Sequence, residues 1–204
     1  MTRIILVRHR QTEWNRIERF RGRADIPLNE TGLAQAEATG KRVAAEWQPY
    51  AIYTSPLSRS VKTAEAIAKH FDLPVQQYPG LADIDYGEWQ GLSPEEARQR
   101  WPEEIDAWYH RPHQARIPGG EALDDLRARA MITVNELAAH HTDETIVLVA
   151  HTVINRIILL GVLGLSNDRF WRIKQDTCAI NVFETDDGDF TLASLNDTCH
   201  LHAQ

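Results

Sequence analysis

Arg8 and His9 follow directly on an apolar run at residues 4–7, which has the pattern of a strand buried on both faces. His151 stands in the same relation to a second apolar run at 145–150. A helical pattern follows each run, and in open α/β sheets ligands bind outside the carboxyl ends of the strands. We therefore expect a cation and two imidazoles to meet at one edge of a sheet.

Two further polar residues belong to the same expected edge. Arg59 lies just beyond a short strand pattern at 51–54, and Asp83 lies in the loop after another at 74–78. Any one of these residues alone would more often be structural than functional. Their shared position at strand ends is what favours a functional site.

Two kinds of chemistry use histidines in such a group. Histidine is a common zinc ligand, but the interleaved arginines would repel a cation, and no two histidines stand four residues apart on a predicted helix. An anion fits better, because the planar fork of an arginine matches phosphate oxygens. A neutral imidazole can attack phosphorus, and the arginines and second imidazole can stabilise charge on the transferred group. The residue types indicate phosphoryl transfer.

The elements that must position these residues alternate between strand and helix along the chain. This alternation predicts an α/β three-layer sandwich, with a mostly parallel central sheet and helices on both faces. Strand patterns at 177–184 and 190–195 flank the turn signal Asp186-Asp187-Gly188, and they predict an antiparallel hairpin at one edge. Helices are expected after a capping Thr31, from about residue 58, after Gly119-Gly120-Glu121 and over 152–163.

The regular rhythm fails between residues 93 and 118. Ser93-Pro94-Glu95-Glu96 is a strong helix start, and aromatic residues such as Trp101 and Trp108 stand among charged ones. We interpret residues 92–118 as a small helical cap inserted into a single domain that spans residues 1–204.

Composition excludes several classes of protein. The net charge of −7 argues against a nucleic-acid partner, and no apolar run approaches the roughly 18 residues that span a bilayer. Cys178 and Cys199 are the two cysteines, too few for a disulfide scaffold. Because the first residues lead straight into a strand pattern, we expect no signal peptide and a cytoplasmic location. The oligomeric state is left open, with a homodimer as one arrangement.

A series of motifs resembles the histidine phosphatase superfamily (phosphoglycerate mutase-like), and in particular its small bacterial-type phosphatase branch. The motifs keep the family's order and cover most of the chain. They are Leu6-Val7-Arg8-His9-x-x-Thr12-x-Trp14-Asn15, Asp25-Ile26-Pro27-Leu28-Asn29-x-x-Gly32, Thr54-Ser55-Pro56-Leu57-x-Arg59-x-x-x-Thr63-Ala64, Asp85-Tyr86-Gly87-x-Trp89-x-Gly91, Pro118-Gly119-Gly120-Glu121 and Val149-Ala150-His151.

The resemblance implies a role for each matching residue. His9 would be the nucleophile that becomes phosphohistidine, and Asp83 would protonate the leaving oxygen and later activate water. A raised pKa would suit Asp83 for the first of these tasks. The family mechanism needs no metal and no cofactor. The rest of the phosphate pocket would consist of Arg8, Arg59 and His151, with Asn15 helping to bind the phosphate.

Four positions depart from the family's common pattern. Arg10 and Thr152 each replace a usual glycine, Asp83 is one methylene shorter than the more frequent glutamate, and Arg21 lies where related phosphatases often have glutamine. Arg10 either points to solvent or supplies an extra cation for a second acidic group on the substrate. The Thr152 hydroxyl is a candidate phosphate contact, and Arg21 is a candidate substrate contact.

The leading functional hypothesis is a metal-independent phosphomonoester hydrolase that acts on a small phosphorylated metabolite. The chain is compact, whereas mutases of the family are generally longer around the active site. One alternative is a cofactor-dependent phosphoglycerate mutase, an isomerase. Another is a pseudo-phosphatase that binds a phosphorylated ligand without turnover, an alternative suggested by Arg10 and Thr152.

Overall fold

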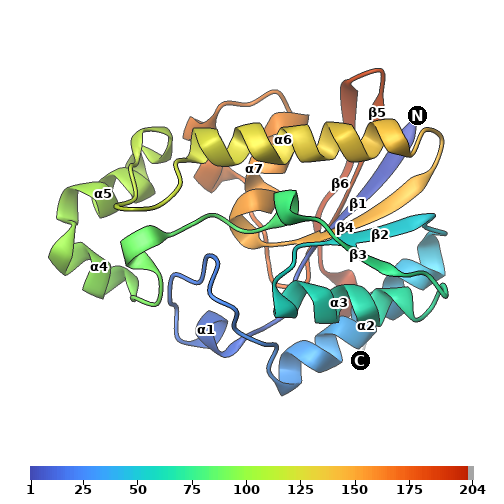
Figure 1. Ribbon diagram of the computed structural model, residues 1–204, viewed down its shortest axis with the longest axis horizontal. Coiled ribbons are helices and arrows are strands. Elements are labelled where there is room, and N and C mark those ends of the chain that lie inside the picture. The colour runs from blue at the N-terminus through green and yellow to red at the C-terminus, as the bar shows by residue number, and fades with distance from the viewer. Residues whose placement is uncertain (202–204) are drawn as a thin grey trace.

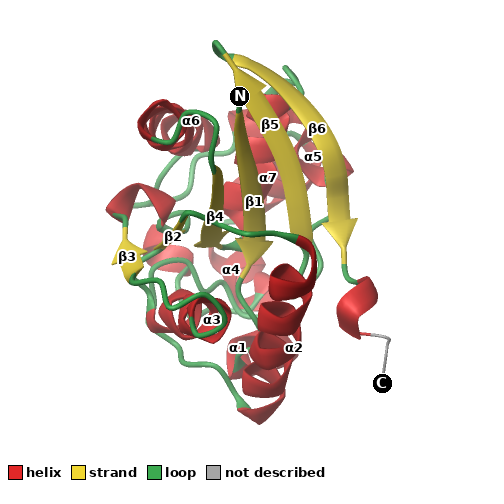
Figure 2. Cartoon of the chain, turned by 90° about the vertical axis from the view of Figure 1, so that its right-hand side faces the viewer, coloured by secondary structure: helices red, strands yellow, loops and turns green. Residues whose placement is uncertain are grey.

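The structure is a computed structural model that describes residues 1–201. Its centre is a six-stranded sheet in the order β3-β2-β4-β1-β5-β6 (Figure 1). Strands β1 (Thr2–Arg8), β2 (Ala51–Thr54), β3 (Val75–Gln77) and β4 (Thr145–Ala150) are parallel. Strands β5 (Ile180–Asp186) and β6 (Asp189–Asp197) add the expected antiparallel hairpin at one edge (Figure 2).

The apolar run in β1 supplies both faces of the sheet with core side chains. Ile4 and Leu6 belong to one buried cluster, and Ile5 and Val7 belong to another. Successive side chains of a strand point to opposite faces, so a run without polar residues requires a cover on each side. None of these four side chains is exposed.

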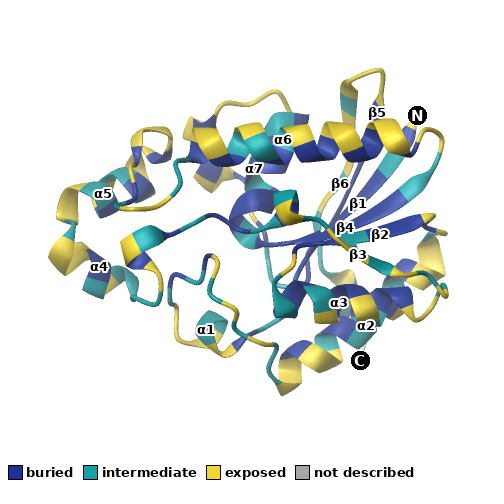
Figure 3. Ribbon diagram, in the orientation of Figure 1, coloured by how far each residue is buried: buried dark blue, intermediate teal, exposed yellow. Residues whose placement is uncertain are grey.

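Helices provide that cover in two layers. Helices α2 (Glu30–Glu46) and α3 (Ser58–Ala68) pack on one face, and α6 (Leu123–His140) and α7 (Thr152–Val162) pack on the other. Figure 3 shows the inward sides of these helices buried and their outer sides exposed. The predicted three-layer α/β fold is therefore confirmed.

Helix α2 starts slightly earlier than the sequence predicted. Its cap is Asn29, whose side-chain oxygen accepts a hydrogen bond of 2.9 Å from the amide of Gly32, so the cap expected at Thr31 is wrong. Gly32 is required because a Cβ there would overlap the carbonyl oxygen of Gln11. This close approach fixes the start of α2 against the loop that follows β1.

The segment predicted as a cap contains α4 (Pro94–Arg100) and α5 (Pro102–His110), which lie at one end of the molecule (Figure 1). The predicted start signal works as expected, because the Ser93 hydroxyl accepts from the Glu96 amide and the Glu96 carboxylate accepts from the Ser93 amide. Ile105 and Trp108 are buried in the same core as α6 and α7.

The remaining helical elements are short. They are α1 (Glu13–Arg16) and the 3₁₀ turns η1 (Pro79–Leu81), η2 (Gly87–Trp89), η3 (Pro112–Gln114), η4 (Asn167–Arg172) and η5 (Cys199–Leu201). Within residues 1–201, no helix combines the length and the apolar character needed to cross a membrane.

Candidate active site

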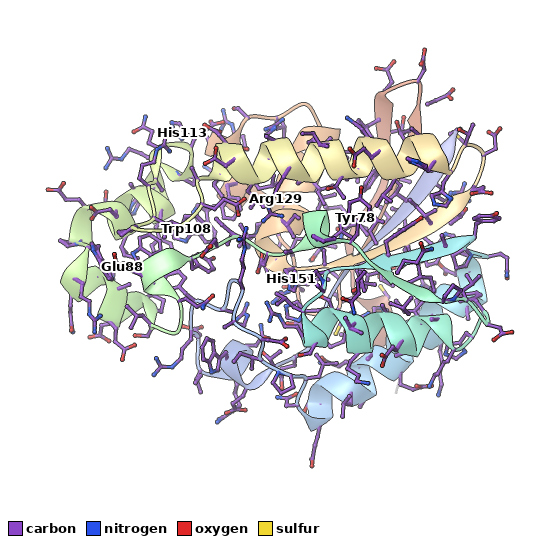
Figure 4. The ribbon with its side chains drawn as sticks, in the orientation of Figure 1. Tyr78, Glu88, Trp108, His113, Arg129 and His151 are labelled. Carbon is purple, nitrogen blue, oxygen red and sulfur yellow. The ribbon has the colours of Figure 1, made fainter. Side chains whose placement is uncertain are left out.

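His9 and His151 meet because their strands are neighbours. In the parallel pair of β1 and β4, Arg8 is opposite Ala150, so the next residue of each strand end is a histidine. The two imidazole centroids lie 5.0 Å apart, and both side chains are almost fully buried. Figure 4 shows His151 near the middle of the molecule, at the end of the sheet that faces the cap segment.

The hydrogen bond of His9 determines which ring nitrogen carries its proton. Nδ1 lies 2.7 Å from the carbonyl oxygen of Arg10. A carbonyl only accepts hydrogen bonds, so Nδ1 must carry the hydrogen and Nε2 keeps its lone pair when the ring is neutral. His9 is therefore held in the tautomer that a nucleophile requires.

His151 is oriented by two hydroxyl groups. Its Nε2 lies 2.7 Å from the Ser55 Oγ and 3.3 Å from the Ser60 Oγ, at the end of β2 and the start of α3. The other ring nitrogen, Nδ1, is buried and has no hydrogen-bond partner among residues 1–201. A buried polar nitrogen without a partner costs free energy, and this one is available to a ligand.

Both imidazoles are uncharged at neutral pH. Burial lowers the pKa of His9 well below 6.5, and the neighbouring His151 and Arg59 lower it further. Burial and the charges of Arg59 and Arg21 lower the pKa of His151 in the same direction. A neutral His9 is the nucleophilic form, because protonation would occupy the Nε2 lone pair.

Two arginines at the strand ends supply positive charge. The Arg8 guanidinium donates to the Gln175 carbonyl at 2.6 Å, and burial, with the charges of Arg21 and Arg156, lowers its pKa to about 9. The Arg59 guanidinium donates to the carbonyls of Gly22 and Ala24 at 2.7 and 2.6 Å. Burial lowers the pKa of Arg59 to about 10, so both guanidiniums remain charged at neutral pH.

Arg129 on α6 holds the backbone of the loop that carries Asp83. Arg129 donates to the carbonyls of Ala82 and Asp83 at 2.7 and 2.9 Å, and its Nε is 2.7 Å from a Glu121 carboxylate oxygen (Figure 4). The Asp83 side chain is buried, and its Oδ1 has no partner within the described chain. Burial raises the pKa of Asp83 against the opposing effect of Arg59. The site thus favours a protonated carboxyl group.

A cavity of about 150 Å³ adjoins these groups. Asp83, Arg21 and Arg156 supply its ionisable side chains together with Arg19, which pairs with Glu96. Phe20, Tyr86, Trp108, Tyr109 and Trp171 form its aromatic walls. The cap segment therefore contributes to the cavity through α5.

Two larger hollows lie elsewhere on the molecule. One of about 510 Å³ is lined by residues such as Met1 and Asp186, at the opposite end of the strands. Another of about 600 Å³ lies between α2 and the segment around Cys199. Neither contains the buried imidazoles or an unpaired buried carboxyl group, so volume is a poor guide to the chemistry of this molecule.

Comparison with known proteins identifies the family to which the chain belongs. The family model described as histidine phosphatase superfamily (branch 1) matches residues 4–198. The chain belongs to this superfamily.

Two curated relatives show the range of the family. The chain is 34% identical to phosphoserine phosphatase 1 of Hydrogenobacter thermophilus, over 98% of this chain and 95% of that protein. It is 32% identical to a 2,3-bisphosphoglycerate-dependent phosphoglycerate mutase of Mesorhizobium japonicum, over 94% and 95% of the two chains. Hydrolases and isomerases are thus both among the relatives of this histidine phosphatase.

Solved structures share the fold throughout. Bacillus stearothermophilus YhfR superposes with a TM-score of 0.94 at 31% identity, covering 98% of this chain and 100% of that one. A phosphoserine phosphatase mutant of Entamoeba histolytica in complex with phosphoserine gives a TM-score of 0.89 at 27% identity, with the same coverage. The protein is a histidine phosphatase superfamily enzyme, and phosphomonoester hydrolysis is the activity that its relatives support best.

Two of the remaining predicted residues line the cavity, and a third lies in α1. Thr152 and Arg21 line it, and the Thr152 hydroxyl is buried without a partner in residues 1–201. The Asn15 Oδ1 accepts from the Thr12 amide and hydroxyl at 2.9 and 2.8 Å, which fixes the side chain at the start of α1. Phosphate contacts for all three stay predictions.

Arg10 does not point to solvent, so that alternative is wrong. The side chain is completely buried, its guanidinium donates to the Arg8 carbonyl at 3.1 Å, and it lies beside the Cys178 thiol. The cavity walls do not include Arg10. The protein therefore accommodates this arginine in its interior, beside Cys178. A contact of Arg10 with a second acidic group of the substrate stays a prediction.

Sequence reasoning missed Arg156 and the hydroxyls of Ser55 and Ser60. Arg156 lies four residues after Thr152 on α7, so both residues lie on the same face of the helix, and both line the cavity. That spacing was a signal that could have been used. The serines gave no comparable signal, because their contact with His151 joins segments that are distant along the chain.

The described residues 1–201 contain no cluster of three or more His, Cys, Asp or Glu side chains arranged to hold a metal ion. The charged groups that surround the imidazoles are mainly guanidiniums, which suit an anionic ligand and not a cation.

Proposed function

We propose that the protein hydrolyses a small phosphomonoester in two steps, through a phosphohistidine on His9. The observation that supports this most strongly is the neutral His9 ring, with Nδ1 bound to a carbonyl and Nε2 left as a nucleophile beside two buried guanidiniums.

In the first step, the Nε2 lone pair attacks phosphorus and the bond from phosphorus to the leaving oxygen breaks. Asp83, whose pKa is raised by burial, acts as the acid and donates its proton to that oxygen. Arg8 and Arg59 neutralise the charge on the remaining phosphoryl oxygens, and the unpartnered Nδ1 of His151 is available as a further contact.

In the second step, Asp83 is a carboxylate and takes a proton from water. The water oxygen attacks phosphorus, the bond between nitrogen and phosphorus breaks, and its electron pair returns to the His9 Nε2. The products are inorganic phosphate and the protonated Asp83, so both catalytic groups return to their starting states.

Phosphoserine is the first substrate to test. The names of relatives from Hydrogenobacter thermophilus and Arabidopsis thaliana state that activity, and the Entamoeba histolytica structure holds phosphoserine. A phosphoglycerate mutase is the second candidate function, favoured by the relative from Mesorhizobium japonicum. A cytoplasmic location and a homodimer remain predictions that the test does not require.

The test is phosphate release in EDTA from phosphoserine, a sugar phosphate, an aryl phosphate and 3-phosphoglycerate, with conversion to 2-phosphoglycerate followed in parallel. We expect rapid release from at least one ester. Interconversion without release would establish a mutase, and silence with phosphate still bound would establish a binding protein. Activity that requires added magnesium or zinc would contradict the metal-free mechanism.

A further inference from the structure

The cavity carries more positive charge than a phosphoryl group requires. Arg21 and Arg156 line it, and Arg8 and Arg59 lie within electrostatic range of Arg21 and Asp83. None of these four arginines forms an ion pair with a carboxylate in residues 1–201. The one carboxyl group among them is Asp83, whose pKa is raised by burial. A phosphoryl dianion balances Arg8 and Arg59, which leaves Arg21 and Arg156 without a counter-charge.

Arg156 is held in place from one side. Its Nε donates to the Ile173 carbonyl at 2.8 Å, and its guanidinium carbon lies 5.1 Å from the Phe170 ring centroid and 4.8 Å from that of Trp171. Both terminal nitrogens of the fork lack a hydrogen-bond partner in the described chain, although the residue lines the cavity. These nitrogens are the groups that a planar anion would bind.

The aromatic rings behind Arg156 are themselves fixed to the cap segment. The Trp171 Nε1 donates to the Trp108 carbonyl at 2.7 Å, and the Trp171 ring stacks on Tyr109 with centroids 5.4 Å apart. Trp108 also packs edge-on against Trp171. Because these contacts already hold Arg156 and its aromatic neighbours in place, little side-chain entropy remains to be lost when Arg156 binds a ligand.

Tyr86 adds a neutral hydrogen-bond donor. It lines the cavity, and its hydroxyl lies within electrostatic range of Arg21 and Arg156. Burial raises the pKa of Tyr86, so the hydroxyl keeps its hydrogen at neutral pH. Two arginines and one tyrosine thus line the same cavity as Asp83.

We propose that Arg156, assisted by Arg21 and Tyr86, is a specificity-determining residue that binds a carboxylate on the substrate. This inference rests on the proposed phosphatase function and narrows it to phosphomonoesters of small carboxylic acids. A carboxylate matches the bidentate fork of Arg156, and a cavity of about 150 Å³ has room for a short acid.

The matched substrates are O-phosphoserine and O-phosphoethanolamine, which differ by the carboxylate alone. We expect the unmodified enzyme to prefer phosphoserine in kcat/KM. Arg156→Met should lower kcat/KM for phosphoserine by roughly 10- to 100-fold, mainly through KM, because a hydrogen-bonded charge pair of this kind is lost. The same variant should change kcat/KM for phosphoethanolamine by less than about threefold.

Two further variants make the test specific. Arg172→Met removes an exposed guanidinium from η4 and should leave both substrates unaffected. Arg21→Gln should reduce the preference in the same direction as Arg156→Met, since it removes the second charge. Thermal unfolding of each variant shows whether it is folded, and Arg156→Lys, which keeps the charge but not the fork, replaces Arg156→Met if that protein does not fold.

The outcomes separate this inference from the function on which it rests. Equal loss on both substrates in Arg156→Met would show a structural role and overturn the inference. Equal use of both substrates by the unmodified enzyme would also overturn it, while the phosphatase assignment would stand. Failure to release phosphate from these esters and from an aryl phosphate would overturn the phosphatase assignment, and the inference with it.

Discussion

A single hydrogen bond sets the reactivity of His9. Because Nδ1 donates to the Arg10 carbonyl, Nε2 is the nitrogen that keeps its lone pair and can act as a base or nucleophile. We expect His9→Ala to reduce phosphate release by on the order of 10⁴-fold while the protein stays folded, since covalent catalysis is lost. Single-turnover labelling with ³²P-phosphoester measures this directly. Release at the unmodified rate, or a label that persists in the variant, would contradict the assignment.

Asp83 has the environment of a general acid. Burial raises its pKa, which extends to higher pH the range in which it carries the proton needed by the leaving oxygen. Asp83→Asn should slow hydrolysis of an alkyl phosphate by roughly 10²- to 10⁴-fold and that of an activated aryl phosphate far less, because a good leaving group needs no proton. Parallel kinetics with the two esters tests this, and equal slowing would count against the role.

The same residue predicts a pH dependence for the first step. The acid form of Asp83 exists below its raised pKa, so formation of the phosphoenzyme from an alkyl phosphate should slow as the pH rises through that value. The rate with an aryl phosphate should not show this decrease. Rapid-mixing measurements of phosphoenzyme formation between pH 5 and pH 9 would distinguish the two esters.

At the scale of elements, α6 positions the loop that carries Asp83. The Arg129 guanidinium bonds to the carbonyls of Ala82 and Asp83 and pairs with Glu121, although it does not line the cavity (Figure 4). Loss of these bonds would release the loop from the helix and leave buried carbonyl groups without donors.

We expect Arg129→Met to lower kcat for an alkyl phosphate by roughly tenfold or more, with a smaller effect on an aryl phosphate, because the position of the acid is what changes. The matched control is Arg127→Met on the same helix, where the side chain bonds to the Leu165 carbonyl instead. A uniform loss with both esters would show that Arg129 acts through stability alone.

For the whole molecule, the two buried imidazoles couple stability to pH. Both have pKa values well below 6.5 in the folded protein, so below about pH 6.5 the unfolded chain binds more protons than the folded one. The free energy of unfolding should therefore decrease as the pH falls from 6.5, by roughly 1.4 kcal/mol per pH unit for each histidine.

Denaturant unfolding between pH 7 and pH 5 checks this coupling. His9→Asn should reduce the slope by the contribution of one histidine. Asp83 acts in the opposite sense, because its raised pKa means that the folded state binds the extra proton as the pH falls towards 3.8. A slope unaffected by His9→Asn would contradict a neutral buried ring.

The sequence predicts most of the strands and the residues that stand at their ends. The strands at 51–54 and 145–150 match the predicted ranges, because an uninterrupted apolar run must be buried on both faces wherever it lies in the chain. The residues at the ends of such strands meet at one edge in any parallel arrangement, so His9 and His151 could be paired without coordinates. Membership in the histidine phosphatase superfamily, predicted from the motifs, is confirmed.

Only the tertiary structure decided what each side chain faces. Arg10 could point to solvent or to substrate in the sequence, but the approach of β1 to the segment around Cys178 buries it. The contacts that hold Arg156 come from η4, which is in turn bound to α5, and these two elements are distant from each other along the chain. Local pattern specifies which residues form an element, whereas the partners of a buried charge depend on packing between segments that no local pattern relates.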